Sequence, residues 1–209
     1  MSMLSTSTLL SDYLTGVASD DTASVTTLGR ALTRVESLTA NELGYPGVNP
    51  TLASTSYVQR IQGLSSSPKA LLIPLAPVTA LASVYQDLDQ VFGTDTLIAS
   101  SDYELEVFAN GAYLHLLPRG NTSRWLTAER SIKVSCTAGY ADEAAMPAAL
   151  ADALYRWVAS WWLRRTSRHL TSQAQGQVTQ GLAKLDACPP DVEEILVNFR
   201  LLGGCWGVS

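Results

Sequence analysis

The sequence predicts an α+β fold: a four-helix core with a small antiparallel β-sheet or sandwich inserted into its middle connection. Apolar residues recur at helical spacing up to residue 46 and after residue 147, whereas short alternating runs fill residues 54–140. Clusters of Gly, Pro, Asn and Ser separate the two patterns. A chain of 209 residues, 46% of them hydrophobic, can bury one sizeable core, so we expect one composite domain.

Residues 1–46 are expected to form two helices. The first runs from about Thr6 to Thr15 and ends at Gly16. Asp21 and its neighbours supply the cap of the second, which Gly44 and Pro46 stop. The apolar stripe of the second helix consists of Val25, Leu28, Leu32, Val35, Leu38 and Leu43.

Residues 54–140 are expected to form six short strands. Ile132, Val134 and Cys136 alternate with polar residues, as in a strand with one buried face. Asn110-Gly111 between two runs predicts a hairpin. The expected strands are Tyr57–Gln62, Ala70–Leu75, Leu81–Tyr85, Tyr103–Val107, Ala112–Leu117 and Ser131–Thr137.

Residues 147–209 are expected to form two more helices and a tail. Pro147 opens a helix that places Trp157 and Trp161 on one core-facing side. Pro189 and Pro190 begin the fourth helix, which Gly203-Gly204 ends. Its expected buried side consists of Ile195, Leu196, Phe199 and Leu202.

The sequence contains no motif for catalysis, a cofactor or a metal ion. His115 and His169 are far apart, and neither H-x-x-x-H, a phosphate-binding glycine loop nor a nucleophile elbow occurs. Cys136, Cys188 and Cys205 are an odd number without C-x-x-C spacing. We therefore expect no enzyme, no cofactor and no metal site.

Two further function classes are disfavoured by composition. A net charge of −5 gives no general basic surface for nucleic acid. The most apolar run, 70–82, is short and contains two prolines, so no membrane span is expected, and residues 1–10 do not resemble a signal peptide. These features predict a soluble protein made in a reducing cytoplasm.

Charge is segregated along the chain. Residues 70–118 contain no Lys or Arg but carry six carboxylates: Asp87, Asp89, Asp95, Asp102, Glu104 and Glu106. The expected third helix carries the cations Arg156, Arg164, Arg165 and Arg168. Such regions suit electrostatic pairing between neighbouring copies in an assembly. The alternative is a solvated acidic surface and cations that complement a helix C-terminus.

Four motifs follow one another in the middle of the chain. They are Pro77–Tyr85, Ser101–Leu105, Ile132–Tyr140 preceded by Trp125, and Met146–Leu150, which opens an Ala-rich helix that ends in Arg164-Arg165. In this order they resemble the head–tail connector, or adaptor, proteins of tailed bacteriophages. The resemblance covers most of Leu9 to Arg165 and is less clear beyond Thr171.

The resemblance implies a connector-type helical core and a structural role in the virion. Such proteins form a ring, commonly dodecameric, below the portal, which extends the DNA channel and joins the head to the neck or tail. The implied partners are the portal protein, the next neck or tail protein and further copies of the chain. DNA would be passing cargo only, no membrane is involved, and assembly would take place in the host cytoplasm.

Two surfaces follow from this interpretation. The apolar chain end suggests portal docking through Leu201, Leu202, Cys205 and Trp206, although docking onto its own domain is the alternative. Ring self-contacts are expected between Arg164, Arg165 and Arg168 on one side and Asp87, Asp89, Glu104 and Glu106 on the other.

Two other classes of function compete with the connector. The first is a β-sandwich binding or capsid-decoration module, with Tyr103, Tyr113 and Trp125 as an aromatic platform for a glycan or capsid surface. The second is a hydrolase built on Glu104 and Glu106, which share one strand face.

Overall fold

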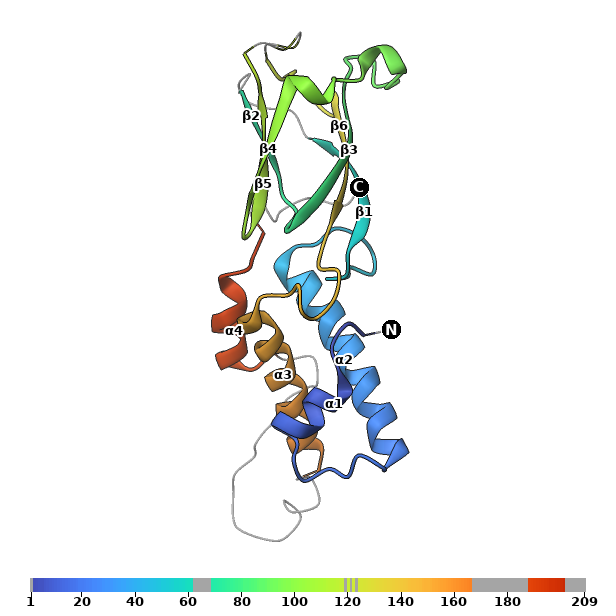
Figure 1. Cartoon of the computed structure of the whole chain (residues 1–209), viewed down its shortest axis with the longest axis vertical. Coiled ribbons are helices and arrows are strands. Elements are labelled where there is room, and N and C mark those ends of the chain that lie inside the picture. Colours follow the sequence, from blue (N-terminus) through green and yellow to red (C-terminus); the bar gives the residue numbers. More distant parts are fainter. Residues whose placement is uncertain are drawn as a thin grey trace. The chain divides into compact units, whose positions relative to one another are not determined.

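The chain folds into a helical unit and a β unit. The computed structural model describes residues 2–61, 69–118, 120, 122, 124–166 and 188–201. The helical unit consists of Met1–Leu52 and Ala141–Arg200, and the β unit consists of Ala53–Tyr140 and takes in Leu201. Helices and two small antiparallel sheets are both present (Figure 1), which confirms the predicted α+β class.

Both predicted N-terminal helices are present, but the first is shorter than predicted and ends at Tyr13. Helix α1 (Thr6–Thr8) continues into a π-helical turn (Leu9–Tyr13), and helix α2 spans Thr22–Leu43. The Asp21 side chain caps α2 by accepting bonds from the N–H groups of Ala23 and Ser24. At the other end Gly44 has a φ of 91°, the left-handed conformation that glycine adopts most readily.

The C-terminal helices are α3 (Ala148–Thr166) and α4 (Pro190–Val197). Helix α3 buries Leu150, Leu154, Trp157 and Val158, whereas Trp161 is half-buried rather than in the core. Helix α4 buries Val192 and Leu196.

The predicted end of the fourth helix is wrong. The N–H groups of Asn198 and Phe199 bond to carbonyls three residues earlier, so α4 ends at Val197 in a tight turn. Phe199 therefore lies beyond the helix and is half-buried, as is Ile195. Leu202, Gly203 and Gly204 lie outside the described residues.

All six predicted strands are present in the β unit. They are β1 (Thr55–Ile61), β2 (Ala70–Ile73), β3 (Val78–Gln86), β4 (Tyr103–Phe108), β5 (Gly111–Leu116) and β6 (Ile132–Ala138). One sheet has the order β1-β6-β3 and the other β2-β5-β4, and all pairs are antiparallel (Figure 1). The predicted hairpin joins β4 to β5 through Ala109 and Asn110, with Gly111 opposite Phe108.

Each sheet buries one face, because successive side chains of a strand point to opposite sides. Val134 is opposite Val84 in the first sheet, and Leu114 is opposite Leu71 in the second; all four are buried. Trp125 is only 1% exposed, and its indole Nε1 donates a 3.1 Å hydrogen bond to the carbonyl of Lys69. The core of the β unit is thus apolar, with the indole N–H satisfied.

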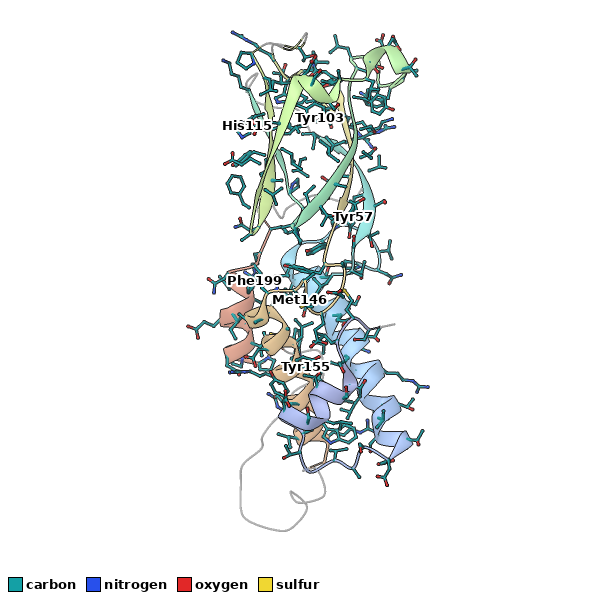
Figure 2. All side chains as sticks on the ribbon, viewed as in Figure 1. Tyr57, Tyr103, His115, Met146, Tyr155 and Phe199 are labelled. Atoms are coloured by element: carbon teal, nitrogen blue, oxygen red, sulfur yellow. The ribbon has the colours of Figure 1, made fainter. Side chains whose placement is uncertain are left out.

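Two carboxylates hold the first residues of the chain within the helical unit. Glu36 Oε1 accepts bonds from Ser2 Oγ at 2.6 Å and from the N–H groups of Met3 and Leu4 at 2.9 and 3.0 Å. Glu143 accepts from the Ser5 N–H and from the hydroxyl of Tyr155, which lies among the helices in Figure 2. None of the described helices is both long enough and apolar enough to span a bilayer.

Candidate interaction surfaces

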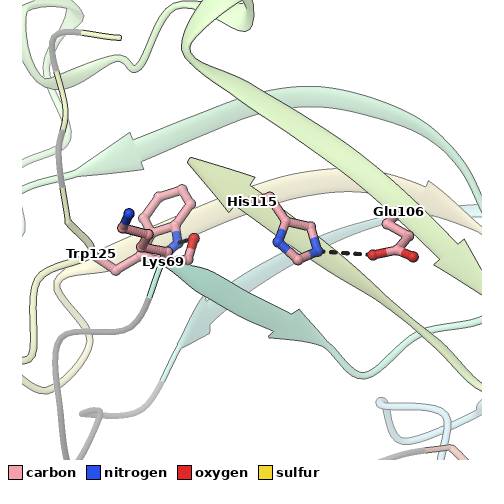
Figure 3. A network of polar contacts seen from close by, with 4 residues as sticks. All are labelled: Lys69, Glu106, His115 and Trp125. Carbon is pink, nitrogen blue, oxygen red and sulfur yellow. Dashed lines mark hydrogen bonds and ion pairs between the residues drawn. The ribbon is translucent and has the colours of Figure 1, made fainter. Parts of the chain in front are cut away.

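The two glutamates of β4 lie on an open sheet face. Glu104 is opposite His115 and Glu106 opposite Tyr113 in the register with β5. His115 Nε2 lies 3.0 Å from Glu106 Oε2, so the histidine bonds to its diagonal neighbour (Figure 3). Both glutamates are exposed to water, whereas a glycosidase-type carboxylate pair works within a substrate cleft. The arrangement therefore favours a solvated surface pair, which agrees with a structural role for His115.

The described part of the chain contains no cluster of three or more His, Cys, Asp or Glu side chains that would hold a metal ion. Cys136 and Cys188 are free thiols, and burial raises the pKa of each to about 11. Both thiols therefore stay protonated at neutral pH. His169 and Cys205 lie outside the described residues.

The three aromatic residues proposed as a glycan platform do not share a surface. Trp125 is buried, and its N–H is occupied by Lys69 (Figure 3). Tyr103 pairs with Leu116, whereas Tyr113 pairs with Glu106, and these two pairs point to opposite faces of the sheet. The sequence prediction of a platform is wrong because it took no account of the strand alternation that separates the two tyrosines.

The connection between β3 and β4 contains an ordered loop, residues 87–98, which we call the 87–98 loop. Asp87 accepts bonds from the N–H groups of Asp89, Val91 and Phe92 at 2.9, 3.0 and 2.8 Å. These bonds favour the charged carboxylate and lower the pKa of Asp87. Asp87 is therefore engaged with its own loop, whereas Asp89 is exposed.

The backbone of the 87–98 loop adopts conformations that side-chain-bearing residues rarely take. Gln90 has a φ of 59° and Phe92 a φ of 55°. The three bonds to Asp87 and the Ile98 N–H bond to the Val84 carbonyl, at 2.9 Å, hold the loop in this form. No sequence motif indicates it, because neither position is a glycine.

Phe92 covers two cations on the outer face of the first sheet. Lys133 Nζ lies 4.2 Å from the ring centre of Tyr85 and 4.8 Å from that of Phe92. Arg60 Cζ lies 5.3 Å from the Phe92 ring centre. Because Arg60, Lys133 and Tyr85 are aligned across β1, β6 and β3, the sheet register itself builds this cation–π cluster.

The last turn of α3 combines cations with aromatic rings. Arg164 and Arg165 are exposed, and Arg165 Cζ lies 5.6 and 5.7 Å from the ring centres of Trp161 and Trp162. Leu163, which follows Trp162 and precedes Arg164, is 58% exposed. Arg156, predicted with these cations, is not part of this cluster, because it forms a 2.8 Å ion pair with Asp152. Arg168 lies outside the described residues.

Of the four residues proposed for portal docking, the structure describes only Leu201. Its side chain is buried. Leu202, Cys205 and Trp206 lie outside the described residues, so portal docking through the tail stays a prediction.

Neither the protein-family models nor the curated proteins contain a match to the sequence. Solved structures do match, and three of them are chains of gene transfer agent (GTA) particles. One, from the virion of a native particle, has 18% identity and a TM-score of 0.48 over 95% of this chain and 89% of that chain. Another, from the neck of a native particle computed with C12 symmetry, has 17% identity and a TM-score of 0.47 over 93% and 90%.

The third similar chain belongs to the neck of an empty GTA particle computed with C6 symmetry. It is 17% identical, with a TM-score of 0.54 over 95% of this chain and 89% of that chain. The match includes both the helical and the β segments, because it leaves out only a twentieth of the sequence. The chain therefore has the fold of a chain found in the neck of that particle.

Proposed function

We propose that this protein is a structural component of a virion: a head–tail connector that forms a ring below the portal, extends the DNA channel and joins the head to the neck or tail. The main support is the fold shared with a GTA neck chain over 95% of the sequence. The ordered motifs between Pro77 and Leu150, which resemble connector proteins, support it independently. The role is one of assembly rather than catalysis.

A closed ring of identical copies needs two different surfaces on each copy, because every contact is head-to-tail. The charge segregation supplies such a pair. The acidic stretch of residues 70–118 and the basic end of α3 attract each other between neighbouring copies. Of the four carboxylates predicted for this contact, Asp89 and Glu104 are exposed without a partner described above, whereas Asp87 and Glu106 bond within their own chain.

Portal docking is assigned to the chain end, through Leu202, Cys205 and Trp206; Leu201, predicted with them, is buried in its own chain. A chain truncated after residue 203 should keep its fold and its thermal unfolding midpoint but lose portal binding in a pull-down with purified portal. Unchanged binding would remove this segment from the portal interface.

DNA passes through the ring without being retained. The 14 Lys and Arg are outnumbered by 19 Asp and Glu, so the chain has no net attraction for phosphates, whose neutralisation supplies most of non-specific DNA affinity.

The deciding experiment is light scattering of the purified chain, alone and mixed with portal from the same genome. One chain has a mass of 22.4 kDa, so a twelve-copy ring would weigh about 270 kDa. A ring-sized species, formed spontaneously or on the portal, is the expected result. A chain that stays monomeric and does not bind portal would contradict the proposal.

A further inference from the structure

Exposed apolar side chains are concentrated in the 87–98 loop. Among the described residues, nine large hydrophobic side chains are exposed, and three of them lie in this loop: Leu88, Val91 and Leu97. Leu88 is 63% and Val91 79% exposed. Figure 1 shows the segment between β3 and β4 projecting past the ends of the strands. Single exposed hydrophobic residues need no explanation, but three within ten residues of one ordered loop do.

The loop is built to hold these side chains in place. Asp87 receives three backbone N–H bonds, and Phe92 is buried against Lys133 and Arg60. Gln90 and Phe92 keep positive φ angles that a relaxed loop would avoid. Strain of this kind persists only where surrounding contacts impose it, and it is concentrated at functional sites. The bonds to Asp87 and the packing of Phe92 therefore keep Leu88 and Val91 exposed to water.

The charges around the loop indicate its partner. Asp89 and Asp95 are exposed within it. The two cations that contact the loop, Lys133 and Arg60, lie against the ring of Phe92, so the loop's own charged side chains are all carboxylates. These side chains favour a partner surface that is apolar with a basic border. The end of α3 has this character, with Leu163 58% exposed and followed by the exposed Arg164 and Arg165.

From this match we infer that Leu88 and Val91 of one copy pack against the end of α3, around Leu163, of the next copy in the assembly. This inference rests on the proposed ring and names its apolar anchor. Asp87 acts here as a positioning residue, because its carboxylate shapes the loop and does not reach the neighbour. Asp89 and Asp95 meet Arg164 and Arg165 at the border of the contact.

The first test compares two double substitutions in the full-length chain, assembled alone or on the portal. Leu88→Ser with Val91→Ser should raise the concentration needed for half-assembly at least tenfold. The matched control, Val48→Ser with Val58→Ser, changes two valines that are 92% and 69% exposed elsewhere and should assemble like the wild type. Circular dichroism and thermal unfolding check that both variants stay folded. Equal assembly of the two variants would overturn the inference.

A second test identifies the opposing surface. Val91→Cys and Leu163→Cys are combined in one chain in which Cys188 and Cys205 are replaced by Ser, and the assembly is treated with a short bismaleimide. Since each copy contributes one thiol from each surface, the double variant should give a ladder of covalent multimers on a denaturing gel. Chains with either new cysteine alone should give none, and a ring that forms without a ladder would overturn the pairing.

The two proposals fail in different ways. If the wild-type chain forms no ring with or without portal, the connector function fails and the inference with it. If the wild type forms a ring and the Leu88 and Val91 variant forms it equally well, only the loop contact is wrong. Loss of assembly in Asp87→Ala, with the fold retained, is expected from its positioning role.

Discussion

Glu36 is a buried carboxylate whose partners are the first residues of the described chain. Removing it in Glu36→Ala leaves the N–H groups of Met3 and Leu4 without their acceptor. We expect the free energy of unfolding to fall by about 1–3 kcal/mol, the usual cost of leaving buried donors unpaired. Urea unfolding followed by circular dichroism measures the change.

The matched control for this substitution is Glu194→Ala, at an exposed position of α4. A surface change of this kind is expected to alter the free energy of unfolding by less than about 0.5 kcal/mol. Equal effects of the two substitutions would show that the Glu36 contacts add nothing to stability.

Two stacked tyrosines are expected to make the helical unit less stable at alkaline pH. Tyr13 and Tyr155 lie 5.2 Å apart, and their hydroxyls donate to Asp152 and Glu143 at 2.6 and 2.7 Å. Burial first, and then these carboxylates, raise the pKa of each tyrosine from 10.0 to about 12. Between pH 10 and about pH 12 the native state therefore keeps phenol protons that the unfolded chain loses.

The sign of the pH effect follows from this difference. The stability contributed by the raised pKa values is fully present below pH 10 and is lost as the pH rises towards about 12. Urea midpoints should fall steeply above pH 10 in the wild type and less steeply in the Tyr13→Phe, Tyr155→Phe double variant. Parallel pH profiles for the two proteins would contradict this assignment.

The part that Asp87 plays in its own loop could not be predicted from the sequence. Its carboxylate was predicted to contact a neighbouring copy, because it lies in an acidic stretch. In the structure it accepts three N–H groups of its own loop. Such a bond set depends on the positive φ angles of Gln90 and Phe92, which no local residue preference indicates.

At the scale of elements, the two glycines at the middle and end of α2 should respond in opposite directions to alanine. Gly29 lies inside the helix, where a new Cβ would meet only Thr6 Oγ1 at 3.8 Å, an ordinary contact. Gly29→Ala should raise the free energy of unfolding by about 0.5–1 kcal/mol. Gly44 has a φ of 91°, which alanine adopts only at a cost. Gly44→Ala should therefore lower the free energy of unfolding by about 1 kcal/mol.

Each substitution serves as the control of the other, because both add one methyl group to the same helix. Thermal and urea unfolding of the two variants provide the measurement. Shifts of the same sign would contradict the assignment of Gly44 as a left-handed helix end.

Periodicity predicted the elements well where one face of each is buried. The alternation of Ile132, Val134 and Cys136 identified β6, and the stripe through Leu28 and Leu32 identified α2. The end of α4 was missed because residues after Val197 keep a helix-like apolar pattern while their bonds switch to a tight turn. Trp161 was assigned to the core on spacing alone, although it lies at the end of α3, where a helix face need not stay covered.

At the scale of the whole molecule, the proposed ring should depend on charge. Arg164→Glu with Arg165→Glu should weaken assembly most at low salt, where exposed charges are least screened, and the defect should shrink as salt rises beyond about 0.1 M. Sedimentation velocity over a salt series measures this dependence.

A matched control keeps the net charge equal. Arg30→Glu with Arg124→Glu makes the same change in net charge at two other exposed positions. If both variants weaken the ring to the same extent, the cause is total charge and the end of α3 has no special part in assembly.

The fold class and its internal order were predictable from the sequence, because burial pattern and turn residues are local properties. The surfaces were predictable only in outline. Charge segregation pointed to an acidic and a basic region, but Leu88 and Val91 were not singled out, since their exposure depends on how the 87–98 loop is held. The dispersal of Tyr103, Tyr113 and Trp125 likewise required the strand register.

The interleaved order of the two units has a consequence for synthesis on the ribosome. The β unit is formed mainly by one continuous stretch, Ala53–Tyr140, whereas the helical unit joins Met1–Leu52 to Ala141–Arg200. Domains generally fold as units during translation, in the order in which their residues emerge. The sheets can therefore close while α1 and α2 still wait for α3, and the helical unit is completed last. The acidic half of the proposed contact is then folded in each nascent chain before its basic counterpart has been translated.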